Sequence, residues 1–290
     1  MVAPRLIATD LDGTLLDPSG QLTPRARRAI MRLAQLQIET VFVTARPPRR
    51  LDDLDDVVGG HGLAICANGA FLYDVGRREV VRSHCFQPDQ LAELAADLRR
   101  ALPGIGFAGE LATGMHLERS YPEVHPRWRP QQASYGSIED APSGVGKLLA
   151  RIPEVAPDPR RGEGSSLPGG ADTHRFLDLV ARVIGERAHV SYSGAVGLAE
   201  IVPAGVSKAS ALAAWCTERG IEASQVWAFG DMPNDVPMLS WAGRSFAVAG
   251  GHELAHAAAT DVCPGNDVDG VAQILETIGS DAAPDGGWVR

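Results

Sequence analysis

Three short, largely apolar runs each lead directly into a polar residue, and this repeated pattern constrains the fold of the 290-residue chain more than any other feature. The runs and the residues that follow them are 6–9 with Asp10, 41–43 with Thr44, and 226–229 with Gly230 and Asp231. Runs without polar alternation are typical of strands buried on both faces of a parallel sheet. Because such sheets bind ligands beyond the carboxyl ends of their strands, we expect Asp10, Thr44 and Asp231 to meet in one crevice.

Helical patterns separate these runs and complete an α/β arrangement. One helix begins at Pro24 after the N-cap residue Thr23, and another ends before Gly220, a residue type common just past helix ends. The expected strands are 5–9, 40–43, 63–66, 226–229 and 245–249. The expected helices are 24–36, 51–58, 207–219, 237–241, a short one after 249 that ends at about 259, and 271–278. Alternation of buried strands and helices predicts a doubly wound, Rossmann-like parallel sheet.

The middle of the chain has a different composition and predicts a second domain. Its candidate helices are 88–102 and 173–187, and its candidate strands are 104–108, 115–117, 189–193 and 197–202, with segments rich in Pro, Gly and Arg between them. We therefore expect an α+β domain of residues 83–203 inserted into a core made of residues 1–82 and 204–290. Residues from about 280 read as a loose tail.

Charge and composition exclude several classes of protein. The formal net charge is −9, which argues against a nucleic-acid partner because such proteins usually carry a basic face. The sequence holds no apolar run of about 18 residues, so no membrane-spanning helix is expected. Its four cysteines lie far apart, which fits reduced thiols and a cytoplasmic location better than a disulfide framework. The sequence does not predict an oligomeric state.

Carboxylates dominate the expected crevice. Asp10 and Asp12 follow the first strand two residues apart, so one can attack while the other handles a proton if their environments differ. Asp231 and Asp235 follow the strand at 226–229 and add two more acids. Such acids repel one another unless a cation lies between them, and an all-oxygen donor set suits Mg²⁺.

Lysine is used at only two positions, Lys147 and Lys208, although the chain has 27 basic residues. A compact ammonium at the start of the helix at 207–219 suggests a specific role for Lys208, although an ordinary surface lysine is the simpler interpretation.

Together these motifs resemble the haloacid dehalogenase-like hydrolases, and in particular the Cof-type subgroup with a large α+β (type IIB) cap. The matching stretches are DLDGTLL (10–16), the turn at 44–46, Asn68-Gly69-Ala70, EIVPAGVSK (200–208), GDMPND (230–235) and NDVDGVA (266–272). Ala45 departs from the usual Gly of the subgroup, and Gly250-Gly251 replaces the usual Gly-Asn.

The resemblance implies a role for each matching residue. Asp10 is expected to attack phosphorus, and Asp12 to protonate the leaving oxygen and then activate water. The implied metal ligands are Asp10, the Asp12 backbone carbonyl and Asp231. Thr44 and Lys208 are expected to contact the phosphoryl group, and Asn234 and Asp235 to orient Lys208 and the metal. Asn234 is also expected to bind phosphate or substrate, and so are Leu11, Ala45, Arg46 and Asn68.

Two short motifs suggest other chemistry. His252-Glu253-Leu254-Ala255-His256 matches the zinc motif H-E-x-x-H, but the expected helix is short and no obvious third ligand follows. Residues 141–147 are similar to a phosphate-binding P-loop, although the first Gly is absent and Leu148 stands where Ser or Thr is required.

The sequence thus predicts a Mg²⁺-dependent phosphatase that acts on a small, sugar-phosphate-like metabolite through an aspartyl-phosphate on Asp10. The cap is expected to exclude water and select the leaving group. A phosphotransferase or phosphomutase that uses the same intermediate is one alternative. A non-catalytic protein that binds a phosphorylated metabolite is the other.

Overall fold

The computed structural model describes residues 3–51, 54, 62–122, 133–152 and 169–279. The chain divides into two compact units, the first made of residues 1–81 and 207–290 and the second of residues 82–206. These boundaries lie within three residues of those expected from the sequence. The predicted helix at 51–58, apart from residues 51 and 54, and the tail from about 280 lie outside the described residues.

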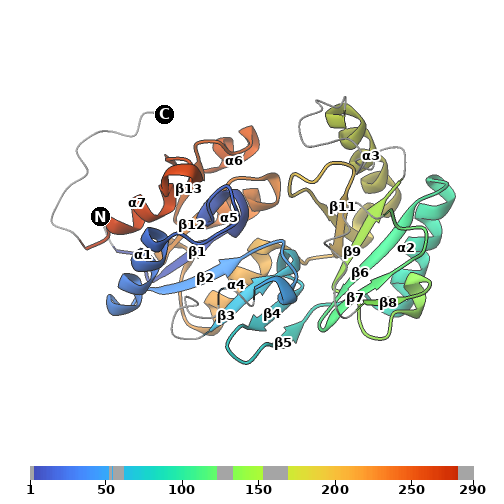
Figure 1. Ribbon diagram of the computed structural model, residues 1–290, viewed down its shortest axis with the longest axis horizontal. Coiled ribbons are helices and arrows are strands. Elements are labelled where there is room, and N and C mark those ends of the chain that lie inside the picture. The colour runs from blue at the N-terminus through green and yellow to red at the C-terminus, as the bar shows by residue number, and fades with distance from the viewer. Residues whose placement is uncertain (1–2, 52–53, 55–61, 123–132, 153–168, 280–290) are drawn as a thin grey trace. The chain divides into compact units, whose positions relative to one another are not determined.

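The first unit is built on an eight-stranded sheet with the order β14-β13-β12-β1-β2-β3-β4-β5 (Figure 1). Its strands are β1 (Leu6–Thr9), β2 (Glu39–Val43), β3 (Leu63–Cys66), β4 (Phe71–Asp74), β5 (Glu79–Ser83), β12 (Val226–Gly230), β13 (Arg244–Val248) and β14 (Asp261–Cys263). Neighbouring strands from β14 to β3 pair in parallel, and β4 pairs antiparallel with β3.

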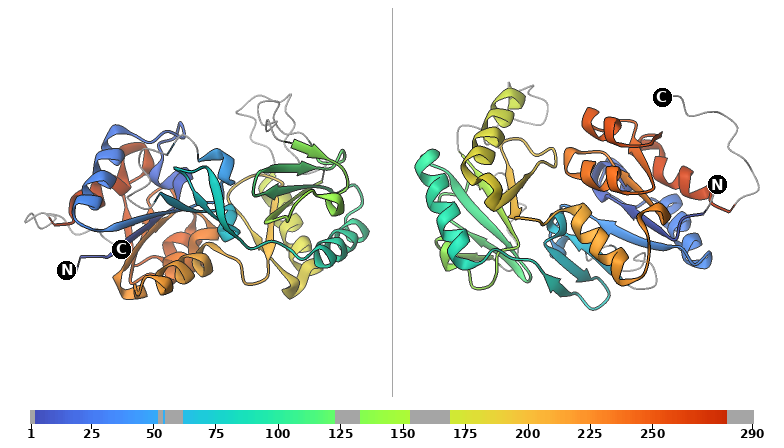
Figure 2. Two further views of the ribbon diagram at one scale, coloured as in Figure 1. Left: turned by 90° about the horizontal axis from the view of Figure 1, so that it is seen from below. Right: turned by 180° about the vertical axis from the view of Figure 1, so that it is seen from behind.

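Helices cover both faces of this sheet, as Figure 2 shows. They are α1 (Pro24–Gln35), α4 (Lys208–Glu218), α5 (Val236–Trp241), α6 (Glu253–Ala258) and α7 (Gly270–Glu276). Helices α1 and α7 pack together, while α4, α5 and α6 share a hydrophobic core with inward-facing residues of the central strands, such as Leu6 and Ala8. The predicted doubly wound α/β class is therefore confirmed.

Strand β1 occupies the position that brings the site residues together. It pairs with β12 on one side and β2 on the other, and the chain order reverses at this point. The carboxyl ends of these three adjacent strands lead into Asp10, Thr44 and Asp231. A topological switch point of this kind opens a crevice at the sheet edge, which is where open α/β sheets bind ligands.

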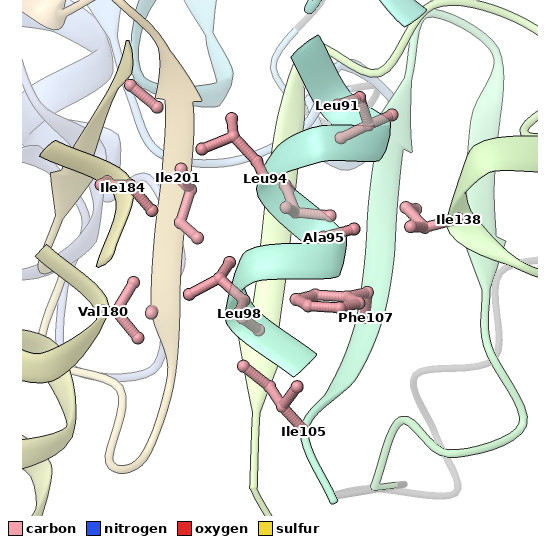
Figure 3. Close-up of a cluster of buried hydrophobic side chains, with 14 of the residues drawn as sticks. Leu91, Leu94, Ala95, Leu98, Ile105, Phe107, Ile138, Val180, Ile184 and Ile201 are labelled. Carbon is pink, nitrogen blue, oxygen red and sulfur yellow. The ribbon is translucent and has the colours of Figure 1, made fainter. Parts of the chain in front are cut away.

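The second unit has a six-stranded sheet with the order β10-β11-β9-β6-β7-β8. Its elements are α2 (Pro88–Ala101), β6 (Gly106–Leu111), β7 (Gly114–Leu117), β8 (Ala133–Tyr135), β9 (Lys147–Arg151), α3 (Gly169–Ile184), β10 (Ala188–Ser191) and β11 (Ala199–Pro203). Leu94, Leu98, Phe107, Val180 and Ile201 belong to the apolar cluster that joins the two helices to the sheet (Figure 3).

Strand β9 was not expected from the sequence, and it contains a buried ion pair. Lys147 Nζ donates to Glu200 Oε1 at 2.5 Å, and both side chains are at most 5% exposed. Lys147, the last residue of the segment similar to a P-loop, therefore lies within a sheet and is paired with an acid. Charged residues at both ends of β9 concealed its strand character, since a run bounded by Lys147 and Arg151 lacks a simple apolar pattern.

Among the described helices, none combines the length and apolar composition that a bilayer crossing requires.

Candidate active site

Asp10 follows the last residue of β1 and is 5% exposed. The next residues form a tight turn in which Gly13 adopts φ +80°, a left-handed conformation that favours glycine. A Cβ atom at Gly13 would collide with the Asp231 carboxylate. The glycine of the DLDGT motif thus lets the loop after β1 approach the loop after β12.

Lys208 connects these two loops through ion pairs. Its Nζ lies 2.7 Å from Asp10 Oδ1 and 2.7 Å from Asp235 Oδ1, and the lysine is 2% exposed. Lys208 is the first residue of α4, which begins after Ser207, whose hydroxyl accepts from the Ser210 N–H. The ammonium is therefore held at a capped helix start between two buried carboxylates.

Asp235 holds the turn that presents Asp231. Its Oδ2 accepts from the backbone N–H of Asp231 at 3.1 Å and of Met232 at 3.0 Å, while its Oδ1 accepts from Lys208. A Cβ at Gly230 would collide with Asp235, so glycine is required there. Because both oxygens of Asp235 already accept hydrogen bonds, we assign it a positioning role.

Asp231 is 9% exposed, and its Oδ1 accepts from the Thr14 hydroxyl at 2.7 Å. One carboxylate oxygen each from Asp10, Asp231 and Asp235 lie within 4.8 Å of one another. This is the only group of at least three potential metal-ligating side chains found among the described residues. The acids predicted to meet at the sheet edge are thus brought together.

The local electrostatics show surplus negative charge. Burial raises the pKa of Asp10 well above its usual value; the attraction of Lys208 opposes this, and Asp235 and Asp231 add to it. Burial is also the main cause that raises the pKa of Asp231 to about 6. Burial alone would lower the pKa of Lys208, but the attraction of Asp10 and Asp235 outweighs it and raises the pKa. The single positive charge of Lys208 therefore does not neutralise the three carboxylates around it.

This donor set fits a hard divalent cation. Asp10 and Asp231 offer carboxylate oxygens, and no described His or Cys joins their group. Oxygen ligands without nitrogen or sulfur suit Mg²⁺ rather than zinc. A cation here would favour the charged forms of both acids and so oppose the burial and the repulsion that raise their pKa.

Asp12 points to a different neighbour. Its side chain is 56% exposed and receives the guanidinium of Arg46 through both oxygens, with Nε–Oδ2 at 2.7 Å and Nη2–Oδ1 at 2.5 Å. Such a two-point contact fixes the orientation of the carboxylate plane. The sequence predicted Asp12 as a general acid and base and Arg46 as a substrate-binding residue. The structure shows that the two side chains are paired with each other.

The other predicted residues surround the same edge of the sheet. Thr44 is buried, and its hydroxyl accepts from the Arg46 N–H at 3.1 Å, across Ala45. Asn68 follows β3 in a left-handed conformation, and its backbone N–H donates to the Thr44 carbonyl. Its side-chain oxygen accepts from Asn234 at 3.1 Å, so the structure connects Asn234 to Asn68, whereas the sequence suggested a connection to Lys208.

Three further residues differ from what the sequence predicted or were not predicted at all. Leu11 is fully buried, so its side chain is not available to a ligand. Thr14 was not predicted as a site residue although it belongs to DLDGTLL, and its contact with Asp231 required the structure. His252 of the H-E-x-x-H sequence precedes α6 as its N-cap, and its Nδ1 accepts from the Leu254 N–H.

Replacing Asp231 with asparagine should stabilise the metal-free protein at about pH 7.5. The folded pKa of about 6 exceeds the unfolded value of ~3.9, so the folded state binds the proton more tightly and stability falls as the pH rises between them. Asparagine removes this cost, on the order of 2 kcal/mol, and can still accept from Thr14. Urea unfolding in metal-free buffer measures the effect, which should vanish near pH 4.

Asp261→Asn is the matched control with the opposite sign. Hydrogen bonding to Arg244 lowers the pKa of Asp261, so its loss should destabilise the protein at about pH 7.5. A destabilised Asp231→Asn variant would show that the charge on Asp231 is stabilising and contradict the electrostatic description.

Fold and site together define a class: an α/β enzyme with a carboxylate–lysine–carboxylate group at the switch point of its sheet, a large inserted α+β unit and donors for a hard cation. The chain belongs to the haloacid dehalogenase-like hydrolases, since the model of that family matches residues 7–125 and 172–275. The family and the hydrolase class predicted from the sequence are therefore confirmed.

Individual relatives resemble the chain over nearly its whole length. It is 26% identical to pyridoxal phosphate phosphatase YbhA of Escherichia coli K12, covering 93% of this chain and 97% of that one. It is 25% identical to the Bacillus subtilis 5-amino-6-(5-phospho-D-ribitylamino)uracil phosphatase YwtE, covering 94% and 98%. The crystal structure of SMU.1108c from Streptococcus mutans shares the fold with a TM-score of 0.79 at 21% identity, covering 94% and 98%.

Proposed function

We propose that the protein is a Mg²⁺-dependent phosphatase that hydrolyses a small phosphorylated metabolite through an aspartyl-phosphate on Asp10. The observation that carries this proposal is the buried group in which Lys208 bridges Asp10 and Asp235 beside Asp231. It combines an oxygen nucleophile, a fixed positive charge and oxygen ligands for a cation, which are the parts that phosphoryl transfer needs.

Asp10 acts as the nucleophile. A carboxylate oxygen forms a bond to phosphorus while the bond from phosphorus to the ester oxygen breaks. Asp12 gives its proton to that departing oxygen, so the alcohol leaves neutral. The exposed position of Asp12, against the buried position of Asp10, supports this division of roles.

The second half of the reaction returns the enzyme to its starting state. Asp12, now a carboxylate, removes a proton from water as the water oxygen attacks phosphorus. The bond between phosphorus and Asp10 breaks, inorganic phosphate forms, and Asp12 holds the proton for the next cycle.

The carboxylates of Asp10 and Asp231 and the backbone carbonyl of Asp12 would hold Mg²⁺. When bound, the cation supplies positive charge that lets an anionic nucleophile approach an anionic phosphate. Asp235 keeps Asp231 in place through its turn, and Thr14 orients the Asp231 carboxylate.

Donors around the sheet edge would bind the phosphoryl oxygens. Lys208 supplies a charged donor, and the buried Thr44 hydroxyl accepts from Arg46, which leaves its proton available to a ligand. The Nδ2 of Asn68 is buried and has no hydrogen-bond partner among the described residues, which supports a contact with an oxygen of the substrate. Backbone N–H groups of Leu11 and Ala45 complete the proposed cradle.

The substrate class follows from the relatives only in general terms. YbhA and YwtE are named for phosphate esters of small metabolites, one carrying a pyridine ring and one a ribityl chain. We therefore assign this chain a small phosphate monoester, with sugar phosphates among the candidates.

A phosphate-release assay over a panel of phosphorylated metabolites tests the proposal. With Mg²⁺, at least one member should yield inorganic phosphate and its alcohol in equal amounts, and EDTA should lower the rate at least about 100-fold. Added Mg²⁺ should restore the rate. Transfer of phosphate to an acceptor sugar instead of water would identify a phosphotransferase, and absence of any turnover with Mg²⁺ would contradict the proposal.

A further inference from the structure

Hydrogen bonds occupy most of the carboxylate oxygens of the three acids at the site, Asp10, Asp231 and Asp235. Asp235 uses both of its oxygens: Oδ1 accepts from Lys208, and Oδ2 accepts from backbone N–H groups of the turn after β12. Asp10 Oδ1 accepts from Lys208 at 2.7 Å, and Asp231 Oδ1 accepts from the Thr14 hydroxyl at 2.7 Å. No described residue donates to the second oxygen of Asp10 or of Asp231, so each of these two acids has one oxygen free of hydrogen bonds.

Thr14 holds Asp231 in this arrangement from the loop after β1. Both side chains are buried, and the hydroxyl of Thr14 competes with a cation for Oδ1 of Asp231. The other oxygen of Asp231 lies against Gly13, where a Cβ atom would collide with Oδ2. With one oxygen engaged by a hydroxyl and the other bordered by backbone, the carboxylate favours coordination of a cation through Oδ2 alone.

The number of oxygens that a carboxylate gives to an ion helps to separate Mg²⁺ from Ca²⁺. Mg²⁺ demands a near-ideal octahedron with ligands at about 2.0–2.1 Å, whereas Ca²⁺ takes more oxygens at about 2.3–2.6 Å and often binds both oxygens of one carboxylate. Because two oxygens of one carboxylate lie close together, they fit the flexible shell of Ca²⁺ better than a regular octahedron. A site whose acids each offer one oxygen therefore favours Mg²⁺.

We propose that Thr14 restricts Asp231 to one-oxygen coordination and thereby favours Mg²⁺ over Ca²⁺ at this site. The inference rests on the Mg²⁺ site of the proposed function, and it names the residue that determines which cation that site prefers. Thr14 is a positioning residue, since it acts through Asp231 and not through the ion or the substrate. Lys208 limits Asp10 in a similar way, but it also contacts the nucleophile, so Thr14 is the residue to replace.

Metal binding to the protein without substrate tests the proposal. The metal-free wild type and Thr14→Val are titrated with MgCl₂ and, separately, with CaCl₂, and the rise of the thermal unfolding midpoint gives a Kd for each ion. Valine has the shape of threonine but no hydroxyl, so Asp231 can turn both oxygens toward the ion. The ratio of the Kd for Ca²⁺ to the Kd for Mg²⁺ should fall at least about 10-fold in Thr14→Val, as expected when a group that orients a metal ligand is lost.

Two further variants control for packing. Thr14→Ser retains the hydroxyl and should keep the ratio within about threefold of the wild type. Thr260→Val is the matched control and should leave the ratio unchanged, because the Thr260 hydroxyl donates to Asp261 Oδ2 at 2.7 Å in the same unit, outside the group of potential metal ligands. Equal loss of affinity for both ions in Thr14→Val, or a serine variant that behaves like the valine variant, would overturn the proposal.

A crystal structure of the wild type with Ca²⁺ gives a second answer that does not depend on how the variants fold. Asp231 should give one oxygen to Ca²⁺ while its Oδ1 keeps the hydrogen bond from Thr14. Two oxygens of Asp231 bound to the ion would overturn the proposal.

Phosphate release from the metabolite panel separates this inference from the proposed function. A changed cation preference in Thr14→Val, without turnover by the wild type, would contradict only the phosphatase proposal. Turnover by the wild type, with an unchanged cation preference in Thr14→Val, would contradict only the role of Thr14. Failure of the wild type to bind either ion would contradict both.

Discussion

Asp10→Asn should lower kcat at least about 1,000-fold without unfolding the protein. A carboxamide oxygen is a poor nucleophile, so no acyl-phosphate forms, yet asparagine has the shape of aspartate and can still accept from Lys208. Steady-state phosphate release with Mg²⁺ measures the loss, and circular dichroism with urea unfolding measures the fold.

Asp261→Asn serves as the control for this prediction. Asp261 is an aspartate of the same sheet whose side chain pairs with Arg244 at the edge strand, so its replacement should leave kcat within about threefold. Residual activity of Asp10→Asn above about 1% of wild type would mean that another group attacks phosphorus.

Lys208→Met should lower both stability and activity by large factors. Removing the ammonium leaves Asp10 and Asp235 buried without their shared partner, and breaking a buried ion pair in this way costs about 3–5 kcal/mol. Loss of the fixed positive charge should also lower kcat about 100- to 1,000-fold. Urea unfolding and phosphate release measure the two effects.

The two effects can be separated by pH and by a second substitution. Without Lys208 the buried acids favour their protonated forms in the folded state, so the loss of stability should shrink as the pH falls from about 7.5 to about 5. Lys208→Met combined with Asp235→Asn should recover part of the stability but none of the activity. Recovery of activity by the double variant would assign Lys208 a purely structural role.

The fold of the first unit could be predicted because its central strands are recognisable from short apolar segments of the sequence. The runs ending at Asp10, Thr44 and Asp231 are apolar at nearly every position, and Thr23 and Gly220 mark helix boundaries by their own backbone preferences. Strand β14 could not be predicted in this way, since it has three residues, and β9 is bounded by charged residues whose partners lie elsewhere in the second unit.

The identity of the main site residues could be predicted from the sequence, but the contacts between their side chains could not. The sequence placed Asp10, Thr44 and Asp231 at one edge of the sheet because each follows a buried strand, and the family resemblance added Lys208. It did not reveal the Asp12–Arg46 pair, the Thr14–Asp231 contact or the Asn68–Asn234 contact, because each depends on side-chain directions set by loops from distant parts of the chain.

The accessibility of the two lysines shows whether each unit is folded. Lys147 lies in the second unit and Lys208 in the first, and both ammonium groups are buried in ion pairs. Reagents that acylate amines need an accessible, deprotonated nitrogen, so in the native protein they should spare both side chains. Acylation of one lysine before the other during gradual denaturation would show which unit opens first, and no residue of the chain needs to be replaced for the measurement.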